Sequence, residues 1–281
     1  MCLANVLIFS AALTAQVPGG GHGGPGSDLI RQATQLDLEG KGADARQILQ
    51  QAVDSATTPA DKAIAQRAMA MSWAFDGNCK KTAEYEQMVI DYWITMEKEQ
   101  PHNAFYQEGE MADEAARVCV DSGDLDAAVQ GYKKGHALGL QEPDISQDRK
   151  ALWEYRLEHA KARISARRGD QAAAERHVAA AKAALDGMKD LRQQQESFFP
   201  YLTGYVAFYL GDYEKALADL EKADQGDPFI QCLLGQTYEK LGDMDPAIEF
   251  YRKASMTHAH NPPGAYVQLF ARKKLSKPPQ P

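Results

Sequence analysis

The chain has 281 residues, of which 44% are hydrophobic and 25% are charged, a balance typical of a folded protein rather than of a disordered one. Acidic residues outnumber basic residues by 39 to 31, which gives a formal net charge of −8. This charge argues against a nucleic-acid backbone or an anionic membrane surface as the main ligand.

The first fifteen residues, MCLANVLIFSAALTA, contain an apolar stretch from Leu3 to Leu13 and end in small residues. This pattern is typical of a secretory signal peptide, although no Lys or Arg precedes the apolar stretch. We therefore expect cleavage after Ala15 and a periplasmic or secreted protein; the alternative is an N-terminal helix on a cytoplasmic protein. Residues 16–27, QVPGGGHGGPGS, are predicted to be a flexible linker because glycines lose much entropy on ordering.

Residues 28–275 repeat one pattern, in which a glycine is followed in five of six copies by an alanine five residues later and, in most copies, directly by an aspartate. The anchor glycines, in chain order, are Gly40, Gly77, Gly123, Gly169, Gly211 and Gly242, with the pattern weakest at Gly77. Successive anchors are 37, 46, 46, 42 and 31 residues apart. A period of this size predicts stacked helical hairpins, because one hairpin cannot bury its apolar face alone.

The last two copies are the clearest, where residues 210–223 read LGDYEKALADLEKA and residues 241–254 read LGDMDPAIEFYRKA. Their small residues recur at helical spacing, so that two antiparallel helices could approach closely. We expect each anchor glycine to end one helix in the left-handed conformation, and Asp212 and Asp243 to cap the next helix. Pro246 is compatible with the first helical turn, whose amides have no partner in the helix.

These copies resemble the tetratricopeptide repeat family. The unit ending at Ala254 carries the family's residues at Leu234, Gly235, Tyr238, Gly242, Ala247, Tyr251 and Ala254, and the preceding unit at Gly204, Gly211, Ala216, Leu220, Ala223 and Pro228. The best-matching region is residues 197–254, and upstream repeats are longer than the family's. The resemblance implies an all-α, right-handed superhelical solenoid of about six helix-turn-helix hairpins. Residues 263–275 would form a C-terminal capping helix, followed by a disordered tail at 276–281.

Three cysteines would remain after removal of a signal peptide: Cys79, Cys119 and Cys232. Cys79 and Cys119 lie near successive turns and could form a disulfide in an oxidising compartment. The alternative is that all three are buried thiols.

The sequence contains no convergent set of acid, base, nucleophile and metal ligands, so we predict a protein without enzymatic activity, metal or cofactor. His258 and His260, in THAHNPP, have no Cys, Asp or Glu close by in sequence. We therefore expect them to lie in a solvated loop.

Two rows of side chains stand out on consecutive helices. The basic row, on a helix expected from about residue 147 to 168, is Arg149, Arg156, His159, Arg163 and Arg167. The aromatic row, on a helix expected at 197–210, is Phe198, Tyr201, Tyr205, Phe208 and Tyr209. The alternatives are a solvated face for the basic row and core packing between repeats for the aromatic row.

The resemblance implies that first helices line a concave, peptide-binding groove, so the two rows would be neighbouring walls. Arginines would pair with carboxylates and aromatic rings would supply apolar contact, which suits a protein or peptide with acidic and apolar side chains. We therefore predict an exported, non-enzymatic protein that binds another protein. The alternatives are an intracellular adaptor of the same fold, or an enzyme or small-ligand carrier, which would require a buried polar cluster facing a closed cavity.

Overall fold

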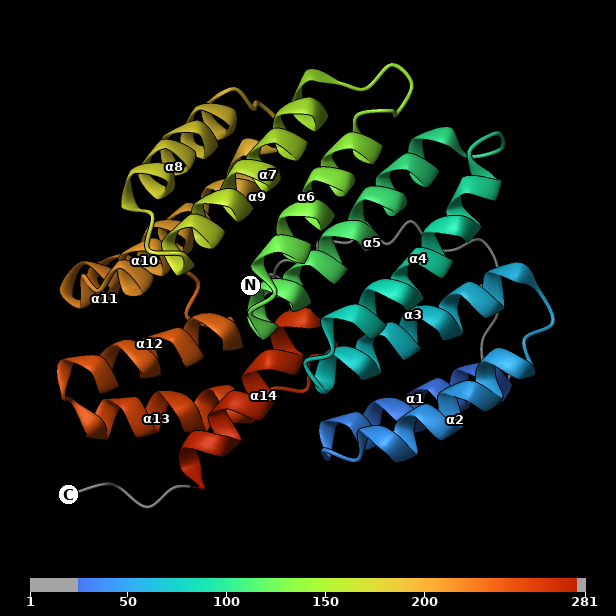
Figure 1. Ribbon diagram of the computed structural model, residues 1–281, viewed down its shortest axis with the longest axis horizontal. Coiled ribbons are helices and arrows are strands. Elements are labelled where there is room, and N and C mark those ends of the chain that lie inside the picture. Colours follow the sequence, from blue (N-terminus) through green and yellow to red (C-terminus); the bar gives the residue numbers. More distant parts are fainter. Residues whose placement is uncertain (1–24, 277–281) are drawn as a thin grey trace, which may run out of the picture.

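A computed structural model describes residues 25–276, in which every regular element is an α-helix (Figure 1). The expected signal peptide, most of the linker and residues 277–281 lie outside the described residues. The expected linker end is wrong, because residues 25–27 form the first turn of a helix. Pro25 suits that position, where the missing N–H would have had no helical partner.

The helices form six consecutive pairs, with a short helix before the fifth pair and one helix after the sixth. The first three pairs are α1 (Pro25–Leu38) with α2 (Gly42–Asp54), α3 (Pro59–Phe75) with α4 (Cys79–Met96), and α5 (Pro101–Ser122) with α6 (Leu125–Gly139). The next elements are α7 (Gln147–Arg167) with α8 (Gln171–Asp186), the short α9 (Arg192–Glu196), and α10 (Phe199–Leu210) with α11 (Tyr213–Leu220). The last are α12 (Pro228–Leu241) with α13 (Met244–Ser255), and α14 (Pro262–Leu275). The predicted all-α solenoid of helical pairs is confirmed.

The anchor glycines make the turns within the six pairs. Gly40, Gly77, Gly123, Gly169, Gly211 and Gly242 have φ values of +80°, +64°, +92°, +73°, +88° and +89°, and no other described glycine has a positive φ. This left-handed conformation is easy only for glycine. The predicted role of these residues is confirmed.

The predicted aspartate caps are confirmed at one of the last two turns and wrong at the other. The Asp212 carboxylate accepts a hydrogen bond of 3.1 Å from the backbone N–H of Lys215. Asp243 makes no such side-chain bond. The residue three positions after Asp243 is Pro246, which has no N–H to donate.

Small residues let the paired helices approach closely. A Cβ placed on Gly204 of α10 would lie 2.7 Å from the Leu220 side chain of α11. In the next pair, a Cβ on Gly235 of α12 would lie 2.8 Å from the Tyr251 ring of α13. The small residues that recur in the sequence therefore lie where the two helices of a pair pack closely against each other.

The terminal helix α14 does more than cap the last pair. It packs on α12 and α13, as expected, and it also contacts α3 and α5 (Figure 1). Ala265 of α14 lies in one buried cluster with Phe75 of α3 and Val118 of α5. These contacts place α14 across α3 and α5, the first helices of the second and third pairs. The family resemblance predicts that first helices line the concave face, so α14 covers part of that face.

Candidate functional site

The first two arginines of the basic row pair with acidic side chains of neighbouring segments. Arg149 lies 2.6 Å from Glu142, in the loop before α7. Arg156 forms an ion pair with Glu110 of α5 and donates a hydrogen bond of 3.2 Å to the Tyr106 hydroxyl. Their charges are therefore balanced within the fold.

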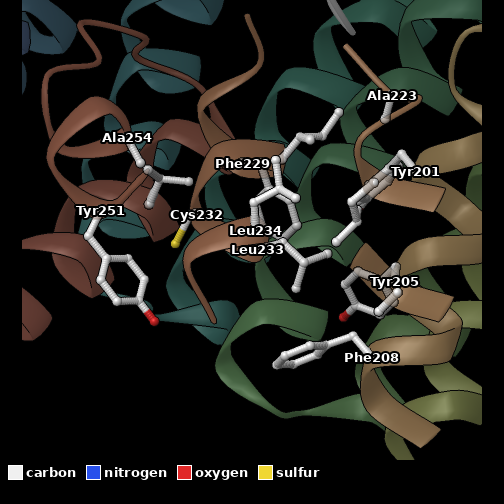
Figure 2. Close-up of a cluster of buried hydrophobic side chains, with 14 of the residues drawn as sticks. Tyr201, Tyr205, Phe208, Ala223, Phe229, Cys232, Leu233, Leu234, Tyr251 and Ala254 are labelled. Atoms are coloured by element: carbon white, nitrogen blue, oxygen red, sulfur yellow. The ribbon is translucent and has the colours of Figure 1, made fainter. Parts of the chain in front are cut away.

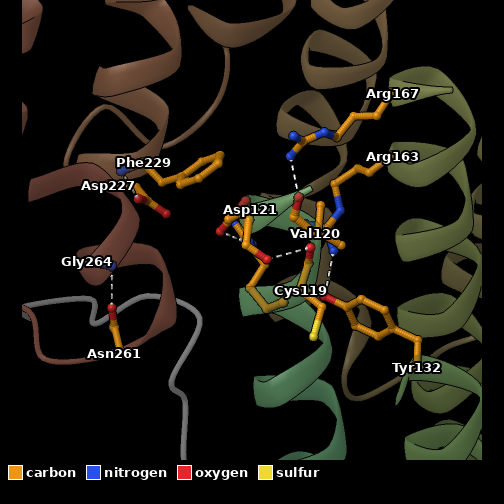
Figure 3. Close-up of polar contacts among 12 residues, drawn as sticks. Cys119, Val120, Asp121, Tyr132, Arg163, Arg167, Asp227, Phe229, Asn261 and Gly264 are labelled. Carbon is orange, nitrogen blue, oxygen red and sulfur yellow. Dashed lines mark hydrogen bonds and ion pairs between the residues drawn. The ribbon is translucent and has the colours of Figure 1, made fainter. Parts of the chain in front are cut away.

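The other two arginines of the row, Arg163 and Arg167, donate hydrogen bonds to uncharged oxygen atoms rather than to carboxylates. Arg163 donates to the hydroxyl of Tyr132 at 3.1 Å, and Arg167 donates to the carbonyl oxygen of Val120 at 2.5 Å (Figure 3). The Arg163 guanidinium also lies 5.8 Å from the Tyr205 ring centroid, and that of Arg167 lies 5.1 Å from the Tyr209 ring centroid. Such cation–π contacts bring the basic and aromatic rows together as neighbours.

Most of the aromatic row is buried. Tyr201, Tyr205 and Phe208 are only 4%, 1% and 8% exposed, and they point toward α12, where Phe229 meets them (Figure 2). Phe198 and Tyr209 are partly exposed. The structure thus brings the two rows together. His159 and Arg163 of the basic row are buried, whereas Arg149, Arg156 and Arg167 are partly exposed. Peptide binding by the two rows stays a prediction.

The interior holds a cavity of about 110 Å³ between α5 and α7. It is lined by Glu110, Asp113, Glu114 and Arg117 of α5, by Tyr132 of α6, by Tyr155, Arg156, His159 and Arg163 of α7, and by Gln195 with residues 261–263. Three of these residues belong to the predicted basic row. The α5 residues were not predicted as a site.

A sequence signal for the α5 residues does exist. Their positions, 110, 113, 114 and 117, recur at three- and four-residue spacing, which puts all four charges on one helical face. Such a pattern is usually an exposed, ion-paired face. Only the packing of α7 and of residues 261–263 over this face makes it an interior surface.

Burial changes the titration of two groups at the cavity. It raises the pKa of the Asp113 carboxyl well above its ordinary value, because a charged carboxylate is poorly solvated there. Burial also lowers the pKa of His159 well below its ordinary value, and the positive charges of Arg163 and Arg117 add to this effect. Burial therefore favours the uncharged form of both groups.

A second, apolar groove lies beside α14. It has a volume of about 220 Å³ and is lined mainly by Ala74, Val118, Pro262, Tyr266, Leu269 and Phe270, with Lys273 and Asp121 among the polar residues. Leu269 is 47% exposed. The groove could accept an apolar segment of another molecule.

Two other predicted features have defined places. The sulfur atoms of Cys79 and Cys119 lie 1.98 Å apart, at disulfide bonding distance, and Cys232 is a buried free thiol. His260 does not lie in a simple solvated loop, because its Nε2 atom lies 2.9 Å from the Asp37 carboxylate.

Within residues 25–276 no group of three or more His, Cys, Asp or Glu side chains is placed to hold a metal ion. No helix of that region combines the length and apolar character needed to cross a membrane.

Comparison with known proteins identifies the repeats. The tetratricopeptide repeat family matches residues 201–228 and 230–256. No curated protein matches the chain. Among solved structures, the MamA protein is 22% identical, with 66% of this chain and 90% of that chain covered at a TM-score of 0.31. A Podosopora anserina protein, described as a kinesin light chain with nearly identical TPR-like repeats, is 15% identical, with 89% and 97% covered at a TM-score of 0.38.

The matched segments coincide with the two helical pairs that turn at Gly211 and Gly242. They also coincide with the region in which the sequence pattern is clearest. The four preceding pairs use the same left-handed glycine turn. Residues 201–256 of this chain therefore contain two tetratricopeptide repeats.

Proposed function

We propose that this chain is an exported, non-enzymatic protein that binds another protein. The observation that carries the proposal is the pair of tetratricopeptide repeats at residues 201–256, joined to four further helical pairs of the same design. Repeats of this kind stack into extended surfaces that suit protein partners.

The partner's binding surface is the apolar groove beside α14. Leu269 is nearly half exposed there, and an exposed apolar groove costs solvation free energy that a partner would recover. The last turn of α14 is basic, with Arg272, Lys273 and Lys274. A partner segment with apolar and acidic side chains therefore fits the groove best.

The basic and aromatic rows are a second candidate surface. They carry the right chemistry for an acidic and apolar peptide, but Tyr205 and Arg163 are almost completely buried. A peptide would reach them only if α14 and residues 261–263 moved away. The exposed groove requires no such movement.

Export is supported by the cysteines. A bond between Cys79 and Cys119 would persist in an oxidising compartment and be reduced in the cytoplasm. Mass spectrometry of the protein from its native organism, after alkylation of free thiols, should find an N-terminus at Gln16 and a single alkylated cysteine, Cys232. A chain that retains residues 1–15 and carries alkylated Cys79 and Cys119 would instead be intracellular.

The binding proposal can be tested by affinity capture from an extract of the native organism, with the chain from Gln16 as bait. We expect Leu269→Glu to lose a protein that the unchanged chain retains, since the charge would be buried in the contact. Ile94→Glu is the matched control, because Ile94 is also 47% exposed but lies in the last turn of α4, away from the groove.

Both variants should first show the same helicity by circular dichroism. Equal loss from both variants would indicate a general effect of surface charge and contradict the groove assignment. If the unchanged chain retained no protein specifically, the binding function itself would be wrong.

A further inference from the structure

Several buried hydrogen-bond donors around the cavity between α5 and α7 have no partner among the described residues, and neither has one carboxyl oxygen, Asp113 Oδ1. Arg163 is 4% exposed, and its Nε and Nη1 atoms have no hydrogen-bond partner among the described residues. The same is true of Arg117 Nη2 and of the Tyr155 hydroxyl. Buried donors without partners cost free energy, so their collection around one cavity requires an explanation.

The charges around the cavity leave one positive charge unbalanced. Glu114 pairs with Arg67 at 2.6 Å, and Glu110 pairs with Arg156. Arg117 has its own partner outside the cavity, the Asp121 carboxylate at 3.0 Å.

Arg163 is left, and its hydrogen bond goes to the neutral hydroxyl of Tyr132. Asp113 is a poor source of the missing negative charge, because burial raises the pKa of its carboxyl well above the ordinary value and so disfavours the charged form. His159 is neutral for the same reason and adds no positive charge. The cluster as a whole therefore suits a ligand with a single negative charge.

The size of the cavity limits the ligand further. A volume of about 110 Å³ holds a few water molecules or a small organic molecule. The ring of Tyr155 provides an apolar wall, and a guanidinium matches a carboxylate through two parallel hydrogen bonds. Residues 261–263 and Gln195 also line the cavity, and its volume is too small for a long peptide.

We propose that this cavity binds a small organic acid through one carboxylate, which Arg163 and Arg117 hold with the Tyr155 hydroxyl. The site is a buried polar cluster that faces a partly enclosed cavity, which comes close to what the small-ligand carrier alternative requires. It adjoins the apolar groove, since Pro262 lines both.

Thermal denaturation of the full chain with acetate, lactate, succinate or inorganic phosphate, at constant ionic strength adjusted with sodium chloride, tests the proposal. At least one carboxylate should raise the melting temperature in a saturable way, because it binds only the folded state. Arg163→Met should lose this response, and Tyr155→Phe should bind the same acid at least about tenfold more weakly.

The matched control is Arg168→Met, five residues after Arg163 and just beyond the end of α7, where the arginine is exposed and pairs with Asp126. This variant should respond as the unchanged chain does. Tyr155→Phe removes a buried hydroxyl that has no partner among the described residues, so the variant without ligand should be at least as stable as the unchanged chain. It keeps the proposal testable if Arg163→Met does not fold.

Three results would overturn the proposal. The first is a response to phosphate but to no carboxylate. The second is a carboxylate response of equal size in Tyr155→Phe, or in a folded Arg163→Met variant. The third is a lack of response to all four probes, which would mean that water molecules alone satisfy the donors.

Discussion

At the scale of single residues, the last two turns differ in one hydrogen bond. The Asp212 carboxylate accepts a bond from the N–H of Lys215, whereas Asp243 has no such bond because Pro246 occupies the donor position. We therefore expect Asp212→Ala to lower the free energy of unfolding by about 1 kcal/mol. Asp243→Ala should change it by less than about 0.5 kcal/mol.

Urea denaturation of the two variants beside the unchanged chain measures this difference directly. The pair is matched, since both aspartates are exposed and both follow a glycine with a φ near +90°. Equal losses in the two variants would show that the Asp212 carboxylate is not a cap, and that another property of aspartate at this position stabilises both turns.

At the scale of helices, the contact within a pair depends on small side chains. Ala216 of α11 is completely buried, and the facing Gly204 already lies close to its backbone, since an added Cβ would be 3.2 Å from the Ala216 carbonyl oxygen. Ala216→Leu should therefore force α10 and α11 apart and destabilise the fold by about 1 to 3 kcal/mol.

The control lies on the same helix. Ala218 is exposed, so Ala218→Leu adds the same atoms with the same helix propensity but without a neighbour to displace. Thermal denaturation should find the two variants far apart in melting temperature. A neutral Ala216→Leu would mean that the helices of this pair do not pack as the repeat pattern requires.

What the sequence predicted at these two scales follows from local rules. A glycine such as Gly211 ends its helix because of its own backbone freedom, and Ala216 faces the partner helix because of helical spacing. Neither inference needs knowledge of distant parts of the chain. The missing cap at Asp243 was also predictable, because Pro246 stands three residues later and cannot donate.

The interior site could not be predicted in the same way. The α5 charges have the spacing of a solvated face, and only α7 and residues 261–263 turn that face into a cavity wall. The contact of Ala265 with Val118 joins positions 147 residues apart, and no local pattern marks either residue. The aromatic row was recognised as a stripe, but its burial depends on α12, through residues such as Phe229.

At the scale of the whole molecule, the first pair is joined directly to the segment between the last pair and α14. His260, just before α14, lies 2.9 Å from the Asp37 carboxylate near the end of α1, and its ring stacks on Phe75 with centroids 5.0 Å apart. Asp37 is 1% exposed and also accepts a hydrogen bond of 2.7 Å from Ser72. The contact holds the segment that leads into residues 261–263, which cover the cavity.

His260→Ala should therefore weaken the closure of the solenoid more than the repeats themselves. Removal of the imidazole leaves a buried carboxylate with one partner fewer, which costs about 1 to 3 kcal/mol. Because α14 is held by this contact while α10 is not, hydrogen exchange should become faster in α14 before it does in α10. His258→Ala is the control, since His258 is exposed and should change stability by less than about 0.5 kcal/mol. If the hydrogen-exchange rate rose equally in α14 and α10, the molecule would open as one unit, and the His260 contact would not stabilise α14 locally.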